Sequence, residues 1–153
     1  MENLSRAVYK EILSGNEELE DLVNLVRHKL KFIEQKPKVL LISNLNPVEF
    51  SSETDLVSLA GGQSAGAFEN PSEADVIIIS PQGSSLGNSL QNISSLLSES
   101  WWSASRAAVQ NKVYIFDSTN DDPVNALESL AEMINPKQFV FGHEGEKWVR
   151  FGV

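Results

Sequence analysis

The chain has 153 residues, 41% of them hydrophobic, with a formal net charge of −9 and no cysteine. This length fits one domain with a sizeable core, and the acidic balance argues against nucleic-acid binding and against a polybasic membrane-surface protein, because both need a basic face. Without cysteine, the sequence excludes disulfides, thiolate metal sites and cysteine nucleophiles, and no apolar run approaches the roughly 20 residues that cross a bilayer, so we expect no membrane insertion.

The sequence predicts a helical segment over residues 1–36 and an α/β lobe with a C-terminal extension over residues 37–153. A long helix begins after Asn16, which can cap it, and ends at Lys36-Pro37. The N-terminus lacks the basic region and apolar core of a signal peptide, so we expect a cytoplasmic chain if Met1 is the native start. The apolar side chains of the long helix form one stripe: Leu19, Leu22, Val23, Val26, Leu30 and Ile33.

Three short apolar runs predict buried strands at Val39–Ile42, Val76–Ile79 and Val113–Phe116. A fourth strand is expected at an edge, from Gln63–Ala67 or from the alternating tail Phe139–Val153. Strands that alternate with helices predict a three-layer, Rossmann-like α/β sandwich with a mostly parallel sheet of about four strands. The helices are expected in the segments 51–60, which ends at the double glycine Gly61-Gly62, and 86–97, 103–109 and 123–134.

Polar segments follow the three strands, and open parallel sheets bind ligands at this carboxyl edge. Trp101 and Trp102 are either core anchors or an aromatic platform for a ligand or partner. The candidate ligand-binding residues are therefore Asn44, Asn46, Pro47, Gln82, Gly83, Ser84, Trp101, Trp102, Thr119, Asn120 and Asp121.

The sequence offers little for metal binding or catalysis. His28 fits a solvated helix position, and His143 lacks the converging ligands of a metal site. Asp117, Asp121 and Asp122 fit turn and capping roles better than a cation site. No nucleophile elbow, phosphate loop or dinucleotide fingerprint occurs. We therefore predict no metal site and no enzyme activity, and the cofactor stays unknown.

Six segments follow one another along the chain: SGNEELEDLVNLVRHKLKFIEQKPKVLLISNLNP, DLVSLAGGQSAG, EADVIIISPQG, WWSASRAAVQNKVYIFD, NALESLAEMINPKQF and FGHEGEKWVRF. In this order they resemble the C-terminal lobe of class III periplasmic substrate-binding proteins, the helical-backbone type, and especially its cobalamin-binding-protein-like branch. The first segment resembles the family's long inter-lobe helix and the strand after it, and the second resembles a helix that ends in a double glycine. The others resemble an aspartate-led strand, a tryptophan-containing helix with its strand, the closing helix and the branch's C-terminal extension.

The resemblance implies solute binding for ABC-type uptake, with a cobalamin-like or metal-chelate ligand, an ABC permease as partner and a periplasmic location if the chain is a fragment. The family's first lobe would lie before Met1, so a separate N-terminal lobe or a homodimer would complete the site. Two loops depart from the family, because Asn44-Leu45-Asn46 and Ser118–Asp121 carry no aromatic residue. The alternative is a reduced, non-transport relative that acts as a protein-interaction or dimerisation module without ligand; a small enzyme ranks third.

Overall fold

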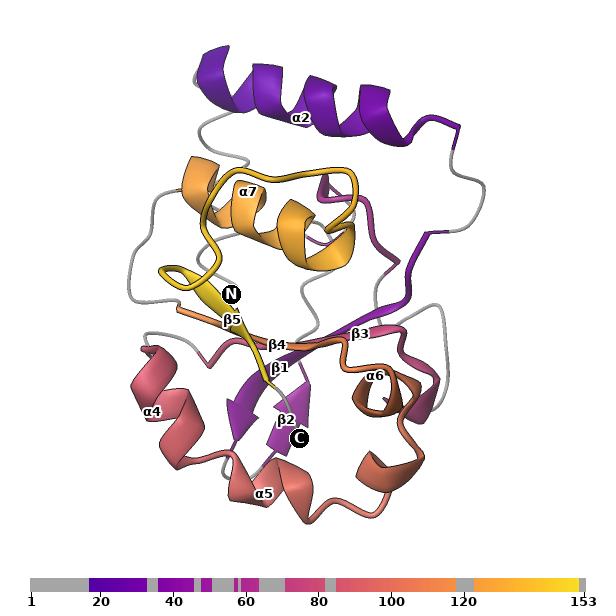
Figure 1. Ribbon diagram of the computed structural model, residues 1–153, viewed down its shortest axis with the longest axis vertical. Coiled ribbons are helices and arrows are strands. Elements are labelled where there is room, and N and C mark those ends of the chain that lie inside the picture. The colour runs from indigo at the N-terminus through magenta and orange to yellow at the C-terminus, as the bar shows by residue number, and fades with distance from the viewer. Residues whose placement is uncertain are drawn as a thin grey trace.

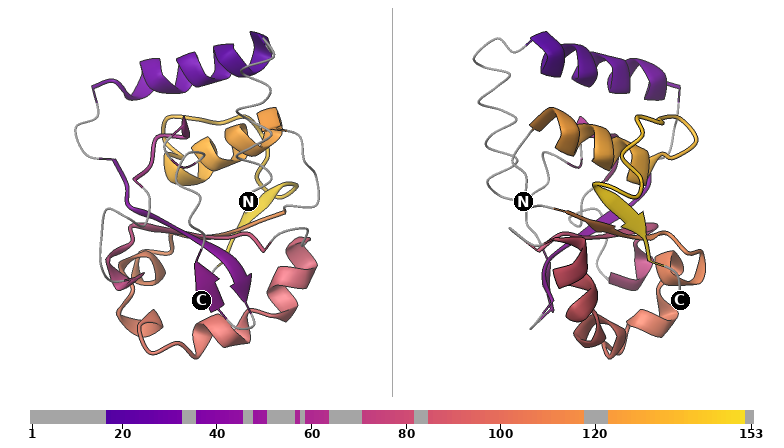
Figure 2. Two further views of the ribbon diagram at one scale, coloured as in Figure 1. Left: turned by 180° about the vertical axis from the view of Figure 1, so that it is seen from behind. Right: turned by 60° about the vertical axis from the view of Figure 1, so that its left-hand side comes forward.

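The computed structural model describes residues 17–32, 36–45, 48–50, 57, 59–63, 71–81, 85–117 and 123–151. In the ribbon, a helical layer covers each face of a central sheet, and α2 lies outside the layer that contains α7 (Figures 1 and 2). None of the helices in these ranges is long and apolar enough to cross a bilayer. The elements are α2 (Glu17–Leu30), β1 (Val39–Leu45), β2 (Val48–Phe50), the 3-10 helix η2 (Pro71–Glu73), β3 (Val76–Ile79), α4 (Leu86–Gln91), α5 (Ser94–Leu97), η3 (Trp102–Ala104), α6 (Arg106–Val109), β4 (Val113–Phe116), α7 (Pro123–Ile134) and β5 (Trp148–Arg150).

The sheet has five strands in the order β2-β1-β3-β4-β5. Strands β1, β3 and β4 pair in parallel, and β2 and β5 add antiparallel edges. The predicted α/β class and mostly parallel sheet are confirmed, and the tail supplies an edge strand as one alternative expected. Gln63 forms a single parallel bridge with Lys38, and the rest of the Gln63–Ala67 prediction lies outside the described residues.

One edge of the sheet differs from the prediction. The loop expected after Ile42 is instead a continuation of β1 to Leu45, which pairs with Val48 of β2 in an antiparallel hairpin. The register shifts between Ile42 and Asn44, which marks a β-bulge or irregularity. Leu45 is buried in the core. Its burial explains why the strand continues past the polar residues Ser43 and Asn44.

The two faces of the parallel strands carry two separate cores, because successive strand residues point to opposite faces. On one face, Leu41, Ile78 and Tyr114 pack with α2 and α7 in a single cluster. On the other face, Ile42, Ile79 and Ile115 pack with Leu96, Trp102 and Ala107 from the helical layer between β3 and β4. Burial on both faces explains why these strands are apolar throughout.

The double glycine lets α2 approach the sheet layer closely. The N–H of Gly62 donates to the carbonyl of Val57 at 2.9 Å, and Gly61 has φ +94°, as in a Schellman helix end. The predicted helix end at Gly61-Gly62 is therefore confirmed. A Cβ on Gly61 would collide with the Cδ1 of Leu30 in α2, and a Cβ on Gly62 would lie 2.7 Å from the Cγ2 of Val39.

The helix predicted over 86–97 is two short helices, α4 and α5, and the one predicted over 103–109 is η3 followed by α6. Ser85 caps α4 by accepting the N–H of Asn88 at 3.2 Å. The side chain of Asn92 then donates to the carbonyl of Asn88 at 2.8 Å, near the end of α4. Serine and asparagine side chains compete for backbone groups in this way, and that competition favours short helices over one long helix.

Candidate ligand-binding edge of the sheet

The carboxyl edge of the parallel strands is described in part. Ser80 follows β3, and its N–H donates to the carbonyl of Ile42 at 2.9 Å, so β1 and β3 stay paired up to the edge. Asp117 follows β4, and its N–H donates to the carbonyl of Lys147 at 2.7 Å. The tail therefore closes one side of this edge, and the β1–β2 hairpin closes the other.

Most of the candidate ligand-binding residues lie outside the described residues: Asn46, Pro47, Gln82, Gly83, Ser84, Thr119, Asn120 and Asp121. Asn44 is described, and the expectation that it lies in a loop is wrong. It lies in β1 opposite Glu49 and is half-buried. Of the polar loop predicted after β3, Pro81–Ser85, the structure describes only Pro81 and Ser85, together with Ser80 before it.

The two tryptophans lie in the helical layer that covers the sheet face opposite α7. Their rings form an edge-to-face pair with centroids 6.0 Å apart. Trp102 is buried in the core of that face, whereas Trp101 is half-buried and packs against the same cluster. Trp102 is thus placed as a core anchor, and Trp101 keeps part of its ring at the surface.

Two serine hydroxyls near this edge are buried without a partner among the described residues. Ser80 follows β3 directly, and Ser89 lies in α4, the helix that starts beyond the same strand. A buried hydroxyl that forms no hydrogen bond costs free energy. The hydroxyl of Ser80, at the very end of the strand, is therefore a further polar group that the sequence analysis did not select.

The sequence analysis also missed Glu132, which is 4% exposed. Its carboxylate accepts the backbone N–H groups of Phe141 at 3.0 Å, Gly142 at 3.2 Å and His143 at 3.3 Å. The imidazole of His143 lies 2.9 Å from the Glu128 carboxylate, one turn earlier in α7. The signal available in the sequence was the spacing of Glu128 and Glu132, which puts both carboxylates on one side of the helix.

His143 is thus paired with a single carboxylate, and no group of three metal-ligating side chains gathers in the ranges that the structure describes. The arrangement is structural, because it ties the tail to α7. Next to it, the ring of Tyr114 contacts that of Trp148 edge-to-face, with centroids 5.3 Å apart. Burial raises the pKa of the Tyr114 hydroxyl above its ordinary value, and the guanidinium of Arg150 partly opposes this shift.

No family model matches the chain, and no curated protein matches it. Solved structures do match. An ABC transporter substrate-binding protein from Listeria monocytogenes aligns with a TM-score of 0.66 and 19% identity over 83% of this chain and 58% of its own. A periplasmic heme-binding protein from Pseudomonas aeruginosa aligns with a TM-score of 0.66 and 13% identity over 92% of this chain and 57% of its own.

A third solved structure has a similar fold. The TroA-like periplasmic binding protein FepB from Veillonella parvula aligns with a TM-score of 0.55 and 20% identity over 81% of this chain and 47% of its own. The aligned part of this chain covers about half of the length of these proteins. At these identities the likeness concerns the fold, and the fold of this chain is that of a periplasmic binding protein lobe.

Proposed function

We propose that this chain is a ligand-binding lobe of a substrate-binding protein for ABC-type uptake, and that its ligand is a metal chelate such as a cobalamin-like corrinoid. The observation that carries the proposal is the fold, since 83% of this chain aligns with an ABC transporter substrate-binding protein at a TM-score of 0.66. The proposal places the lobe outside the cytoplasm, with an ABC permease as its partner.

The proposed binding surface is the carboxyl edge of β1, β3 and β4. Segments that follow parallel strands start from the same edge of a sheet, and polar side chains there can orient a chelate through hydrogen bonds. The proposal assigns ligand contacts to Asn44, Asn46, Pro47, Gln82, Gly83, Ser84, Thr119, Asn120 and Asp121. The half-buried Trp101 is the aromatic candidate, whereas Trp102 is a buried core anchor and is not assigned a ligand contact.

A lobe that spans about half of its structural neighbours supplies one wall of such a site, so the second wall comes from an N-terminal lobe or a second copy. The described apolar stripe of α2, formed by Leu19, Leu22, Val23 and Val26, is buried. A second copy would therefore meet the lobe at its loop edge and not along this stripe.

The test is a titration of the chain with cyanocobalamin, hemin and a ferric siderophore, followed by tryptophan fluorescence and by light scattering. We expect saturable binding of one chelate, weakened by Asn120→Ala and unchanged by Asn24→Ala, an exposed asparagine of α2 that serves as the matched control. A monomer that binds none of the three chelates would contradict the proposal and favour the alternative, an interaction module without ligand.

A further inference from the structure

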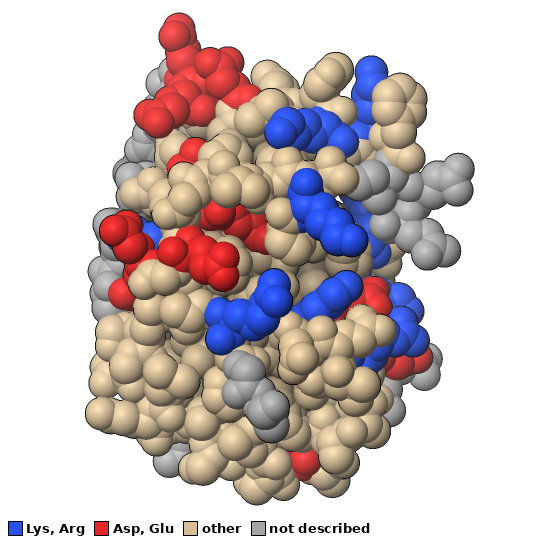
Figure 3. Space-filling model, viewed as in Figure 1, with Lys and Arg blue, Asp and Glu red and all other residues tan. Residues whose placement is uncertain are grey.

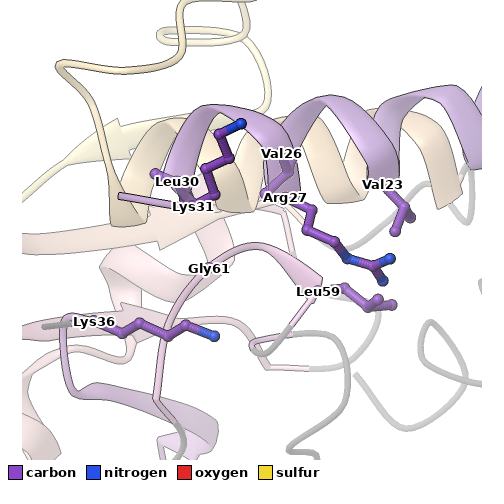
Figure 4. A pocket seen from close by; sticks show the side chains of 8 residues that line it. All are labelled: Val23, Val26, Arg27, Leu30, Lys31, Lys36, Leu59 and Gly61. Atoms are coloured by element: carbon purple, nitrogen blue, oxygen red, sulfur yellow. The ribbon is translucent and has the colours of Figure 1, made fainter. Parts of the chain in front are cut away.

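A cavity lies away from the loop edge, between the last turns of α2 and the double-glycine turn. Its volume is about 260 Å³. Lys36, just before β1, contributes to it, so the cavity lies toward the amino ends of the strands (Figure 4). The lining residues are Val23, Val26, Arg27, Leu30, Lys31, Lys36, Leu59 and Gly61.

The lining combines an apolar surface with cations. Figure 4 shows Arg27 reaching from α2 toward Leu59, whereas Lys36 extends below Gly61. Lys31 is engaged differently, since its Nζ lies 4.9 Å from the ring centroid of Phe32. No carboxylate is among the described lining residues, and the two ion pairs of the described chain involve neither Arg27 nor Lys36.

The charged side chains among the described lining residues are all cations. Guanidinium and ammonium groups bind carboxylates through short, charge-assisted hydrogen bonds. An apolar wall beside these cations therefore fits a ligand that has an apolar body and an anionic head group.

The basic side chains stand out against a chain with a net charge of −9. Figure 3 shows acidic side chains over the amino-terminal end of α2 and basic ones toward its other end. Complementarity to the helix dipole accounts for basic residues in the last turn of α2. It does not account for Lys36, which enters the cavity from outside the helix.

We propose that this cavity binds a small amphipathic carboxylate, whose head group pairs with a cation of the lining, Arg27 or Lys36, and whose apolar body packs on Val26, Leu30 and Leu59. This inference does not rest on the proposed function, since it uses a different part of the fold.

The probe set keeps the apolar body constant and changes the head group: octanoate, octan-1-ol and octylammonium, with acetate as the head group alone. Affinities come from calorimetry, and the site comes from amide shifts of Gly61 and Gly62 in ¹H–¹⁵N spectra. We expect octanoate to bind about tenfold or more tightly than the other three, because it alone combines a carboxylate that a cation can pair with and an apolar body.

The variants Arg27→Gln and Lys36→Gln each remove one cation from an exposed side chain, and the double variant should weaken octanoate binding about tenfold or more. Lys112→Gln removes the same charge from an exposed side chain outside the cavity and should leave binding unchanged. Thermal melts check that each variant is folded. Equal affinity for octanoate and octan-1-ol, unmoved Gly61 and Gly62 amides, or equal binding by the double variant and Lys112→Gln would overturn the proposal. Chelate binding at the loop edge should be the same in all these variants, which separates the two proposals.

Discussion

Glu132 in α7 accepts a hydrogen bond from the indole N–H of Trp148 in β5, with 3.4 Å between Oε1 and Nε1. Both side chains are buried. The same carboxylate accepts three backbone N–H groups from residues 141–143. A single buried carboxylate thus attaches the tail to the helix and holds the strand that closes the sheet beside β4.

Replacing this carboxylate should be costly. We expect Glu132→Ala to lower the free energy of unfolding by about 3 kcal/mol, because it leaves the buried indole N–H of Trp148 and three part-buried backbone N–H groups without an acceptor. Glu132→Gln should cost less, because the amide oxygen still accepts. Urea denaturation measures both, with the exposed Glu146→Ala as the control on the same tail. If Glu132→Ala were as stable as the control, the attachment would not stabilise the fold.

Gly61 is constrained in two ways, which a matched pair of variants separates. Gly61→Ala should cost about 3 kcal/mol, from positive φ and from the clash with Leu30. Gly142→Ala has a similar φ of +92° but nothing within 4 Å of its Cβ position, so it should cost only about 1 kcal/mol. Urea unfolding compares the two, and equal losses would show that the approach of α2 is not tight.

Asp75 makes two interactions that should contribute unequally to the free energy of unfolding. Its Oδ2 accepts the N–H of Lys38 at 2.9 Å, and its Oδ1 pairs with Arg106 at 3.0 Å. The Arg106 side chain is 55% exposed, so Arg106→Ala should cost less than about 1 kcal/mol. Asp75→Ala should cost about 2 kcal/mol, because the N–H at the start of β1 loses its acceptor. Chemical denaturation of both single variants and the double variant checks this, and equal single losses would contradict it.

The pKa of Tyr114 makes stability depend on alkaline pH. Because burial raises this pKa in the folded chain, the folded state keeps its proton when the unfolded chain loses it. The stabilisation is therefore complete below about pH 10, the ordinary tyrosine value, and decreases as the pH rises through the folded pKa. Thermal melts between neutral pH and pH 11 should show a steeper loss for the native chain than for Tyr114→Phe. Parallel curves would contradict this.

The central strands and the closing helix could be read from local patterns. Strands β3 and β4 occupy the expected residues because a strand buried on both faces must be apolar, and polar residues bound each run. The helix α7 begins at Pro123 and ends at Ile134 as expected, since proline fits the first turn and Asn135-Pro136 cannot continue it.

The candidate site was less predictable. Asn44 looked like a loop residue, because the run of apolar residues stops at Ile42, yet it lies in a strand. Whether a polar residue continues a strand depends on the partner that pairs with it, and here the partner is β2. The cavity beside Arg27 and Lys36 has no sequence signature, because its walls come from a helix, a turn and the approach to a strand.

The sequence by itself determined the fold class, the parallel strands and the double-glycine turn, because hydrophobic periodicity and turn chemistry act within a few neighbouring residues. Only the tertiary structure decided that Glu132 is buried under the tail, that Leu30 covers Gly61 and that β2 extends the sheet. These relationships join residues that local pattern does not connect, and they exist only when the packed core brings distant segments within contact distance.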